Sequence, residues 1–147
     1  MITLEVYDER VPEPARLGAE RYLAIARAVN EAVPDGPDGA ITVTYVEDDE
    51  IRRLNRMYRG KDAVTDVLSF GSGMPETGEV GDVIISFAQA ERQALSFAED
   101  GSAPDIELEC TDLVVHGILH VLGFDHERPE DADRMFPLQD RIVERAL

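Results

Sequence analysis

Residues 113–126 read LVVHGILHVLGFDH and hold all three histidines of the chain. Residues 113–122 are apolar apart from two histidines and one glycine, which predicts a helix buried on nearly all sides. His116 and His120 lie four residues apart, so they project from one face of that helix. Gly123 can take the left-handed conformation that ends a helix, after which the chain can reverse and bring His126 back to the first two.

Three imidazoles gathered in this way are typical of a metal site. An unpaired buried polar ring costs roughly 1–3 kcal/mol, and one shared cation satisfies all three rings. A single core histidine is more often held by a backbone or carboxylate partner. Without a metal, each of the three histidines here would need such a partner of its own. Three protein ligands leave a fourth tetrahedral position open, which is the arrangement of catalytic zinc. Imidazole also suits nickel, copper and iron. We expect one Zn²⁺ per chain, held by His116, His120 and His126.

The histidine spacing is shared with one branch of zinc proteases, whose pattern is H-E-x-x-H-x-x-G-x-x-H. His116, His120, Gly123 and His126 match this pattern, whereas Gly117 occupies the place of the glutamate. In those proteases the glutamate is the general base, and a glycine cannot accept a proton. The metal geometry can therefore be shared while the proteolytic mechanism is absent.

Two carboxylates flank the last histidine of the window, Asp125 and Glu127. Either could orient a ligand by a hydrogen bond or accept a proton from water. Roles in the turn or at the surface are equally open for both. The sequence therefore assigns no general base.

The 147 residues have the length of one ordinary domain, and no linker, repeat or low-complexity segment divides them. We therefore expect a single domain over residues 1–147. No apolar run is long enough to cross a bilayer, and no secretory signal is apparent at the N-terminus. The single cysteine, Cys110, excludes an intrachain disulfide. These features predict a cytoplasmic protein with no membrane partner.

The chain is strongly acidic, with 31 acidic residues, 14 basic residues and a net charge of −17. Such a charge repels polyanions at long range. Basic residues are nevertheless concentrated in residues 52–61, which contain Arg52, Arg53, Arg56, Arg59 and Lys61. Salt screens distant charges over about 8–10 Å, so a local cluster can still hold a phosphate.

The members of this basic cluster are not equivalent. A solvated charged face is the more common explanation for Arg52 and Arg56. Arg59 differs because it lies at the predicted helix end, beside Gly60 and Lys61. Arg52, Arg56 and Lys61 are candidate nucleic-acid contacts, and Arg59 is suited to bind phosphate because guanidinium does so bidentately.

The remaining elements follow from apolar patterning and turn signals. Strands are expected over residues 2–7 and 40–46, with two apolar runs at 66–70 and 82–87 that can pair as antiparallel neighbours. Five helices are expected, at about 15–33, 48–59, 88–99, 104–123 and 129–146. The first follows Pro14, and Asp48 or Asp49 is expected to cap the second, which ends at Arg59. The third begins near Ala88 and ends at Glu99. Pro104 and Asp105 suit the first turn of the fourth, with Ser102 as a plausible cap, and that helix runs to Gly123. On the second of these helices Ile51, Leu54 and Tyr58 share one face.

The window HGILHVLGFDH at 116–126 resembles the signature of the YbeY family, the bacterial endoribonucleases of ribosomal RNA maturation. Other segments match that family in order and spacing, and with the window they cover about a quarter of the chain: LNRMYRGKDAVTDVLSF at 54–70, GDVIIS at 81–86 and MFPLQ at 135–139. Phe124 stands where tyrosine is usual, Gly71 replaces a usual proline, and residues 63–64 also differ. These departures concern local loop shape rather than the metal ligands.

The resemblance implies an α+β fold of one domain, with a small mixed four-stranded sheet flanked by about five helices and a metal site on a buried helix and the following turn. It implies a zinc-dependent, single-strand-specific endoribonuclease that acts in 16S ribosomal RNA 3′-end maturation and in ribosome quality control. His116, His120 and His126 would hold the metal, and Arg59 would be the functional arginine. The implied partners are single-stranded ribosomal RNA and the small ribosomal subunit or its assembly factors; no DNA is expected.

Two other functions are compatible with the residues. A metal-dependent peptidase or amidohydrolase is favoured by the protease-like spacing and by the acidic charge, and opposed by Gly117. A non-enzymatic ribosome-assembly factor with structural zinc needs a fourth ligand such as Asp125, since structural sites are closed. The arginine cluster favours a phosphate-containing substrate.

Overall fold

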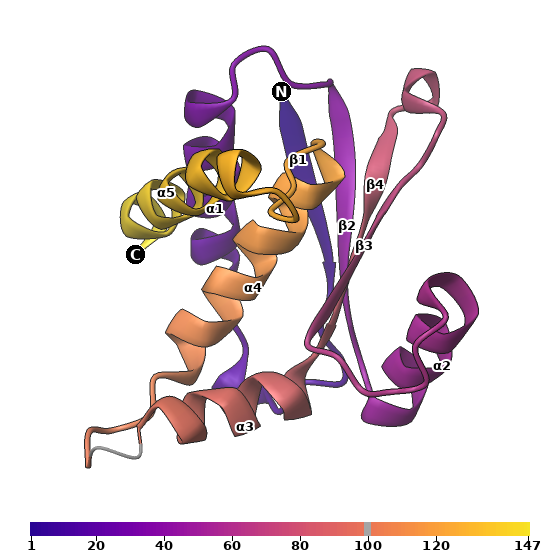
Figure 1. Cartoon of the computed structure of the whole chain (residues 1–147). Coiled ribbons are helices and arrows are strands. Elements are labelled where there is room, and N and C mark those ends of the chain that lie inside the picture. Colours follow the sequence, from indigo (N-terminus) through magenta and orange to yellow (C-terminus); the bar gives the residue numbers. More distant parts are fainter. Residues whose placement is uncertain (99–100) are drawn as a thin grey trace.

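The computed structural model describes residues 1–98 and 101–147, and within them the chain forms one four-stranded sheet and five α-helices (Figure 1). The strands are β1 (Ile2–Tyr7), β2 (Gly39–Val46), β3 (Val67–Gly71) and β4 (Glu79–Ser86). The helices are α1 (Ala19–Ala32), α2 (Asp48–Arg59), α3 (Phe87–Phe97), α4 (Ile106–Val121) and α5 (Pro129–Ala146), with short 3-10 helices at Glu13–Ala15 and Pro75–Thr77. The predicted α+β class is confirmed.

The sheet has the strand order β1-β2-β4-β3 and mixes two kinds of pairing. β2 runs parallel to both β1 and β4, whereas β3 runs antiparallel to β4, with Ser69 opposite Val83. The two apolar runs predicted to be antiparallel neighbours are thus confirmed. β3 is an edge strand, so one side of its backbone faces away from the sheet, toward the site described below.

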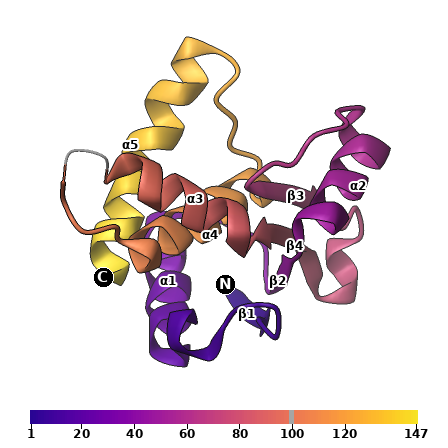
Figure 2. The ribbon, with the colours of Figure 1, turned by 90° about the horizontal axis from the view of Figure 1, so that it is seen from below.

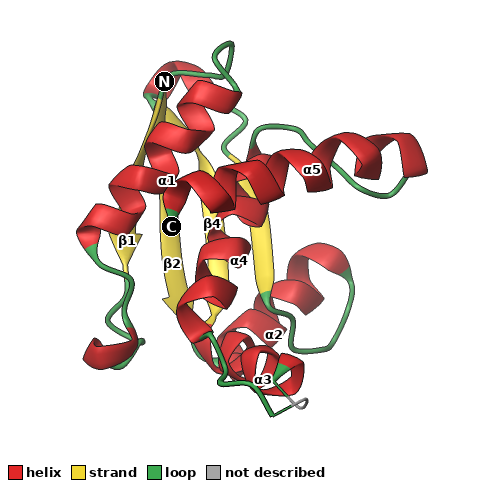
Figure 3. Cartoon of the chain, turned by 90° about the vertical axis from the view of Figure 1, so that its left-hand side faces the viewer, coloured by secondary structure: helices red, strands yellow, loops and turns green. Residues whose placement is uncertain are grey.

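Helices α1, α4 and α5 cover one face of the sheet, as the two rotated views show (Figures 2 and 3). α4 packs against β3 and β4 as well as against α3 and α5. Its Val114, Ile118 and Leu119 are fully buried, which confirms the nearly complete burial predicted for this helix. α2 lies beyond β3 and β4 (Figure 2). Among the described residues, no helix is both long and apolar enough to span a membrane.

Two glycines allow α4 to approach the sheet closely. A Cβ on Gly117 would lie 2.5 Å from Cγ1 of Val83, and a Cβ on Gly81 would lie 2.6 Å from Cγ1 of Val121. Neither position has room for a side chain, because real Cβ contacts are longer than this. The small residues therefore set the distance between α4 and the β3–β4 pair.

The start of α2 differs from the prediction. Its N-cap is Glu47, not Asp48 or Asp49, and Glu47 makes no capping hydrogen bond from its side chain. Asp48 instead accepts a hydrogen bond from Oγ of Ser86 at 2.7 Å, which ties α2 to the end of β4. The Asp48 carboxylate, which the sequence pattern predicts to cap α2, thus binds Ser86, a residue distant in the sequence.

The boundaries of α3 and α4 also differ in detail. The carboxylate of Asp105 caps α4 by accepting a hydrogen bond from the amide of Leu108 at 2.9 Å, so the cap is Asp105 and not Ser102. The helix ends two residues before Gly123. The end predicted for α3, at Glu99, lies outside the described residues.

Candidate active site

The turn after α4 has the conformation that the sequence predicts. Gly123 has a φ of 101°, and its amide donates to the carbonyl of His120 at 3.0 Å. The amide of Phe124 donates to the carbonyl of Leu119, also at 3.0 Å. Together these bonds form a Schellman motif, which satisfies the last carbonyls of a helix and reverses the chain. The reversal brings His126 back to the two helical histidines.

The three imidazole rings converge on one point. The Nε2 atoms of His116 and His120 are 3.0 Å apart, and one ring nitrogen of each histidine lies within 4.8 Å of the other two. His116 and His120 are half-buried, and His126 is exposed. Burial lowers the pKa of His120, and the neighbouring histidines lower it further, so the neutral form that binds metals is favoured. We call His116, His120 and His126 the histidine wall.

His116 is held in one tautomer by a side chain of α5. Oδ1 of Asp112 accepts a hydrogen bond from Nε2 of Gln139 at 2.9 Å, which turns Oε1 of Gln139 toward Nδ1 of His116 at 2.8 Å. Because an amide oxygen can only accept, Nδ1 of His116 carries the proton. Its Nε2 then presents a lone pair to the other histidines. Hydrogen bonds of this kind orient the histidine ligands of metal sites.

The donor set of the histidine wall fits a metal ion with an open coordination position. Three neutral imidazole nitrogens are a ligand set of catalytic zinc. Within the described part of the chain, the group that could hold a metal consists of these three histidines. Asp125, considered above as a fourth ligand, accepts a hydrogen bond from the amide of His126 at 2.7 Å. A closed, structural shell therefore has no support in this arrangement.

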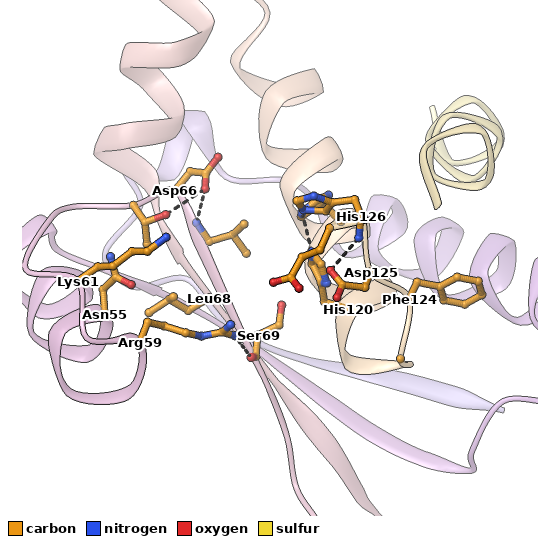
Figure 4. A pocket seen from close by; sticks show the side chains of 15 residues that line it. Asn55, Arg59, Lys61, Asp66, Leu68, Ser69, His120, Phe124, Asp125 and His126 are labelled. Atoms are coloured by element: carbon orange, nitrogen blue, oxygen red, sulfur yellow. Dashed lines mark hydrogen bonds between the residues drawn. The ribbon is translucent and has the colours of Figure 1, made fainter. Parts of the chain in front are cut away.

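A pocket of about 700 Å³ lies between the histidine wall and the end of α2. Figure 4 shows Arg59 and Lys61 on one side of it, the side chains of His120 and His126 on the other, and Ser69 between them. We call Arg59 and Lys61 the basic wall. α2 ends at Arg59 because Gly60 adopts a left-handed φ of 71°. Two segments far apart in the sequence thus meet across one pocket.

Hydrogen bonds fix the basic wall to the rest of the site. Nη2 of Arg59 donates to the carbonyl of Ser69 at 3.0 Å, and Oγ of Ser69 donates to the carbonyl of Gly117, also at 3.0 Å. β3 therefore connects Arg59 to the helix that carries two of the histidines. Asn55, which is buried, donates from Nδ2 to the carbonyl of Ala63 at 2.9 Å and anchors the loop after α2.

The structure separates the candidate nucleic-acid contacts into two groups. Lys61 lines the pocket together with Arg59. Arg52 and Arg56 line a different depression on α2, and Nε of Arg52 is 2.9 Å from Oδ1 of Asp62. This ion pair lowers the pKa of Asp62. Of the candidate contacts Arg52, Arg56 and Lys61, Lys61 is therefore the one that lines the same pocket as the histidines.

Gly117 points toward the sheet, which explains why the protease glutamate is missing. A Cβ at this position would meet Cγ1 of Val83 at 2.5 Å and Cγ2 of Val67 at 3.2 Å. A glutamate does not fit there without moving α4 off the sheet. The carboxylates that do line the pocket belong to Asp66, Asp125 and Glu127.

Three further side chains shape the site although none of them was predicted to be a site residue: Asn55, Phe136 and Gln139. All three lie within segments that match the family, at 54–70 and 135–139. The rings of Phe136 and His126 are stacked, with centroids 5.4 Å apart. Asn55 and Gln139 are 5% and 6% exposed, so each is an amide at a core position. A polar residue in the buried stripe of an amphipathic helix is the signal that could have identified both.

The fold and the site together define a small α+β protein with a three-histidine group that could hold a metal ion, facing a basic wall. This combination characterises a metal-dependent hydrolase whose pocket suits a phosphate ester. The family model described as Endoribonuclease YbeY matches residues 9–146, so the chain belongs to the endoribonuclease YbeY family of hydrolytic nucleases. The resemblance found in the sequence is confirmed.

Individual relatives agree with the family model. A protein named Endoribonuclease YbeY from Geobacillus kaustophilus is 41% identical over 139 residues, covering 86% of this chain and 83% of its own length. Its namesake from Bacillus licheniformis is 38% identical over 157 residues, covering 98% and 94%. A solution structure of a Thermotoga maritima protein is similar with a TM-score of 0.61 and 28% identity, covering 99% of this chain and 89% of that one.

Proposed function

We propose that this protein is a zinc-dependent endoribonuclease that cleaves single-stranded RNA between the histidine wall and the basic wall. One observation carries the proposal: a single pocket is lined by three converging imidazoles and by Arg59 and Lys61. Membership of the YbeY family supports the nuclease activity. Zinc is the proposed metal because imidazole nitrogens with an open position are typical of catalytic zinc.

His116, His120 and His126 would hold the ion. When bound, it would supply Lewis acidity, which stabilises negative charge on a phosphoryl oxygen and makes water a stronger acid. The chain itself contributes imidazoles that are brought together in advance. Gln139 keeps the proton of His116 on Nδ1, and burial lowers the pKa of His120.

Arg59 would bind the phosphate of the scissile bond. A guanidinium has five N–H donors in a planar fork that matches phosphate oxygens, so the bond to Ser69 leaves donors for the substrate. The same bond holds the guanidinium in place, which favours the charge that develops in the transition state. Lys61 adds a second positive charge to the same side of the pocket.

A peptide substrate is disfavoured by two features of the site. The position of the protease glutamate is Gly117, where no side chain fits. An extended peptide commonly adds to an exposed strand edge through backbone hydrogen bonds. Here the edge strand that borders the pocket is β3, and the carbonyl of Ser69 already accepts a hydrogen bond from Arg59. The basic wall therefore occupies an acceptor that an added peptide strand would use.

The finer biological assignment is part of the same proposal. The substrate would be ribosomal RNA near the 3′ end of 16S RNA, handled in the cytoplasm together with the small ribosomal subunit or its assembly factors. Residues 1–147 would act as one domain. Two experiments test the ribosomal assignment. The protein should co-sediment with small ribosomal subunits, and cells that lack the protein should accumulate 16S RNA with unprocessed 3′ ends. A single cooperative unfolding transition tests the single-domain assignment.

Elemental analysis coupled to a cleavage assay tests the activity. Purified protein is expected to contain about one zinc per chain, the number that a single three-histidine site holds. It should cleave single-stranded RNA, lose this activity with a chelator and regain it with zinc, while a fully paired duplex of the same sequence stays intact. Undiminished cleavage by metal-free protein would contradict metal dependence. Intact RNA alongside hydrolysis of a peptide or amide would contradict the nuclease assignment.

A further inference from the structure

Tyr58 is an aromatic residue whose exposure the helical pattern does not explain. It shares a face of α2 with Ile51 and Leu54 in the sequence, and Ile51 is fully buried. The side chain of Tyr58 is nevertheless 61% exposed. It lies one residue before Arg59, at the end of the helix that borders the pocket. A large ring is therefore presented to solvent directly beside the proposed phosphate contact.

The ring of Tyr58 belongs to a contiguous surface with Phe70 and Arg59. The Tyr58 and Phe70 rings meet edge to face, with centroids 5.2 Å apart and planes at 64°. Cζ of Arg59 lies 5.9 Å from the centroid of Phe70. The same guanidinium bonds to the carbonyl of Ser69 at the edge of β3. Arg59 therefore contacts this surface while its side chain lines the pocket.

We infer that Tyr58 and Phe70 form an aromatic platform on which an unpaired base of the RNA substrate stacks. This inference rests on the proposed function. The phosphate held by Arg59 would lie in the pocket, and the base of an adjacent nucleotide would lie against the exposed ring of Tyr58. Phe70 supports Tyr58 through the edge-to-face contact and takes the Arg59 guanidinium over its own ring.

Single-stranded RNA is the ligand that fits this combination. Unpaired bases stack on aromatic side chains, whereas the bases of a duplex are already stacked and paired. A guanidinium next to aromatic rings adds a cation–π contribution. With a net charge of −17, the protein gains little from long-range attraction to RNA. Contacts made at close range, by stacking and by one phosphate clamp, are the means of binding that remain.

Kinetics of Tyr58 variants test the platform. Tyr58→Ala should raise KM for single-stranded RNA about tenfold, because stacking on one aromatic ring is worth about 1–3 kcal/mol per base. kcat and metal content should stay unchanged, because Tyr58 is not a metal ligand and does not contact the scissile phosphate. Tyr58→Phe should restore wild-type KM. The matched control is Tyr7→Ala, which removes an exposed tyrosine from β1, at the opposite edge of the sheet.

A direct signal for stacking is available because the chain contains no tryptophan. Tyr58→Trp would place a single indole on the platform, and Tyr7→Trp would place one at the control position. Titration of the chelated protein with a short oligouridylate should quench the first and leave the second unchanged. An abasic ribose-phosphate strand of equal length, which keeps the phosphates, should quench neither.

These results separate the platform from the proposed function. If the wild-type protein cleaves RNA but Tyr58→Ala has an unchanged KM, or Tyr7→Ala has an equal effect, the platform is wrong and the nuclease stands. Equal quenching of Tyr58→Trp by the abasic strand would also overturn stacking. If the wild-type protein cleaves no RNA, the proposed function itself fails.

Discussion

The two walls of the pocket are built in opposite ways. Two of the three residues of the histidine wall lie on α4, a helix with eight buried residues. Gln139 of α5 accepts a hydrogen bond from His116 and fixes the orientation of its ring. The basic wall stands at the end of α2, which buries two residues, and its two side chains are exposed. One wall is therefore anchored on a helix of the hydrophobic core, whereas the other stands on a helix that buries few residues.

This difference matches what each wall has to do. Metal ligands must be fixed relative to one another, so rings that are held by packing and by hydrogen bonds are an advantage. A substrate phosphate arrives from solvent, so exposed basic side chains with free donors are an advantage, and Ser69 holds Arg59 at the pocket. We therefore expect changes in the histidine wall to act on metal binding or stability. Changes in the basic wall should act on substrate handling alone.

The largest effect should come from His120→Ala. Changes to groups that merely orient a ligand cost about 10- to 100-fold in metal affinity or activity, so loss of a ligand should cost more than about 100-fold. Elemental analysis should show a metal content well below that of the wild-type protein, and RNA cleavage should be undetectable. The thermal transition of the metal-free variant, compared with metal-free wild-type protein, serves as the control for folding. Full metal content in this variant would mean that the three histidines do not act as one ligand set.

Arg59→Ala should lower kcat while leaving bound metal unchanged. Removal of one donor to a developing oxyanion costs about 100- to 1000-fold, and the Arg59 guanidinium is the best-placed such donor on the basic wall. Arg53→Ala is the matched control, since Arg53 is an arginine of the same helix paired with Glu50 at 2.7 Å. Loss of metal from Arg59→Ala would show that the two walls are coupled through Ser69 and are not independent.

Gln139→Leu should weaken metal binding by about 10- to 100-fold, which is the usual cost of removing a group that orients a histidine ligand. Without the amide, Nδ1 of His116 loses its acceptor and Asp112 loses its donor. Competition with a chelator of known affinity measures the change. Gln93→Leu is the control, because Gln93 donates to Glu109 on α4 at 2.8 Å without contacting the histidines. Unchanged affinity in Gln139→Leu would indicate that burial alone holds His116.

The comparison of the walls also explains which parts of the site the sequence could predict. The histidine wall follows from local rules: helical spacing sets His116 beside His120, and a glycine turn returns His126. Gln139 lies 23 residues from His116, and its contact depends on how α5 crosses α4. The apolar pattern of each helix does not determine how α5 packs across α4. The only hint in the sequence is that Gln139 is an amide in the buried stripe of α5.

The basic wall shows the same division between local and long-range information. Helical geometry groups Arg52 with Arg56 and Arg59, and the sequence distinguishes them only by the helix end. The packing of α2 against β4 determines which arginine faces the histidines across the pocket. The hydrogen bond between Asp48 and Ser86 is one of the contacts that fix this packing. The strand at 2–7 and the helix at 129–146 were both predicted correctly. The apolar pattern of the helix is strong enough to identify it although Pro137 lies inside it.

Gly117→Ala should destabilise the protein although alanine is the better helix former. Propensity favours alanine by about 1 kcal/mol in a helix interior. The added methyl would lie 2.5 Å from Cγ1 of Val83, a fully buried residue whose β-branched side chain is restricted in χ1. Overpacking of this kind costs about 1–3 kcal/mol, so the net change should lower the free energy of unfolding.

Chemical denaturation of Gly117→Ala checks this expectation. Gly71→Ala is the matched control, because an added Cβ there has no atom within 4 Å and its φ is not in the left-handed region. A stabilised Gly117→Ala variant would show that α4 can move off the sheet, and the steric argument against a glutamate at this position would then fail.

The smallest expected effect is a difference between Lys61→Ala and Arg52→Ala in the salt dependence of RNA binding. Lys61 lines the pocket, so Lys61→Ala should remove one phosphate contact and reduce the slope of log binding constant against log salt concentration by about 0.7. Arg52→Ala should leave that slope unchanged, because Arg52 pairs with Asp62 in a separate depression. Equal changes in both variants would mean that RNA breaks the Arg52–Asp62 pair and continues along α2. The basic wall would then extend beyond Arg59 and Lys61 to the whole arginine face of that helix.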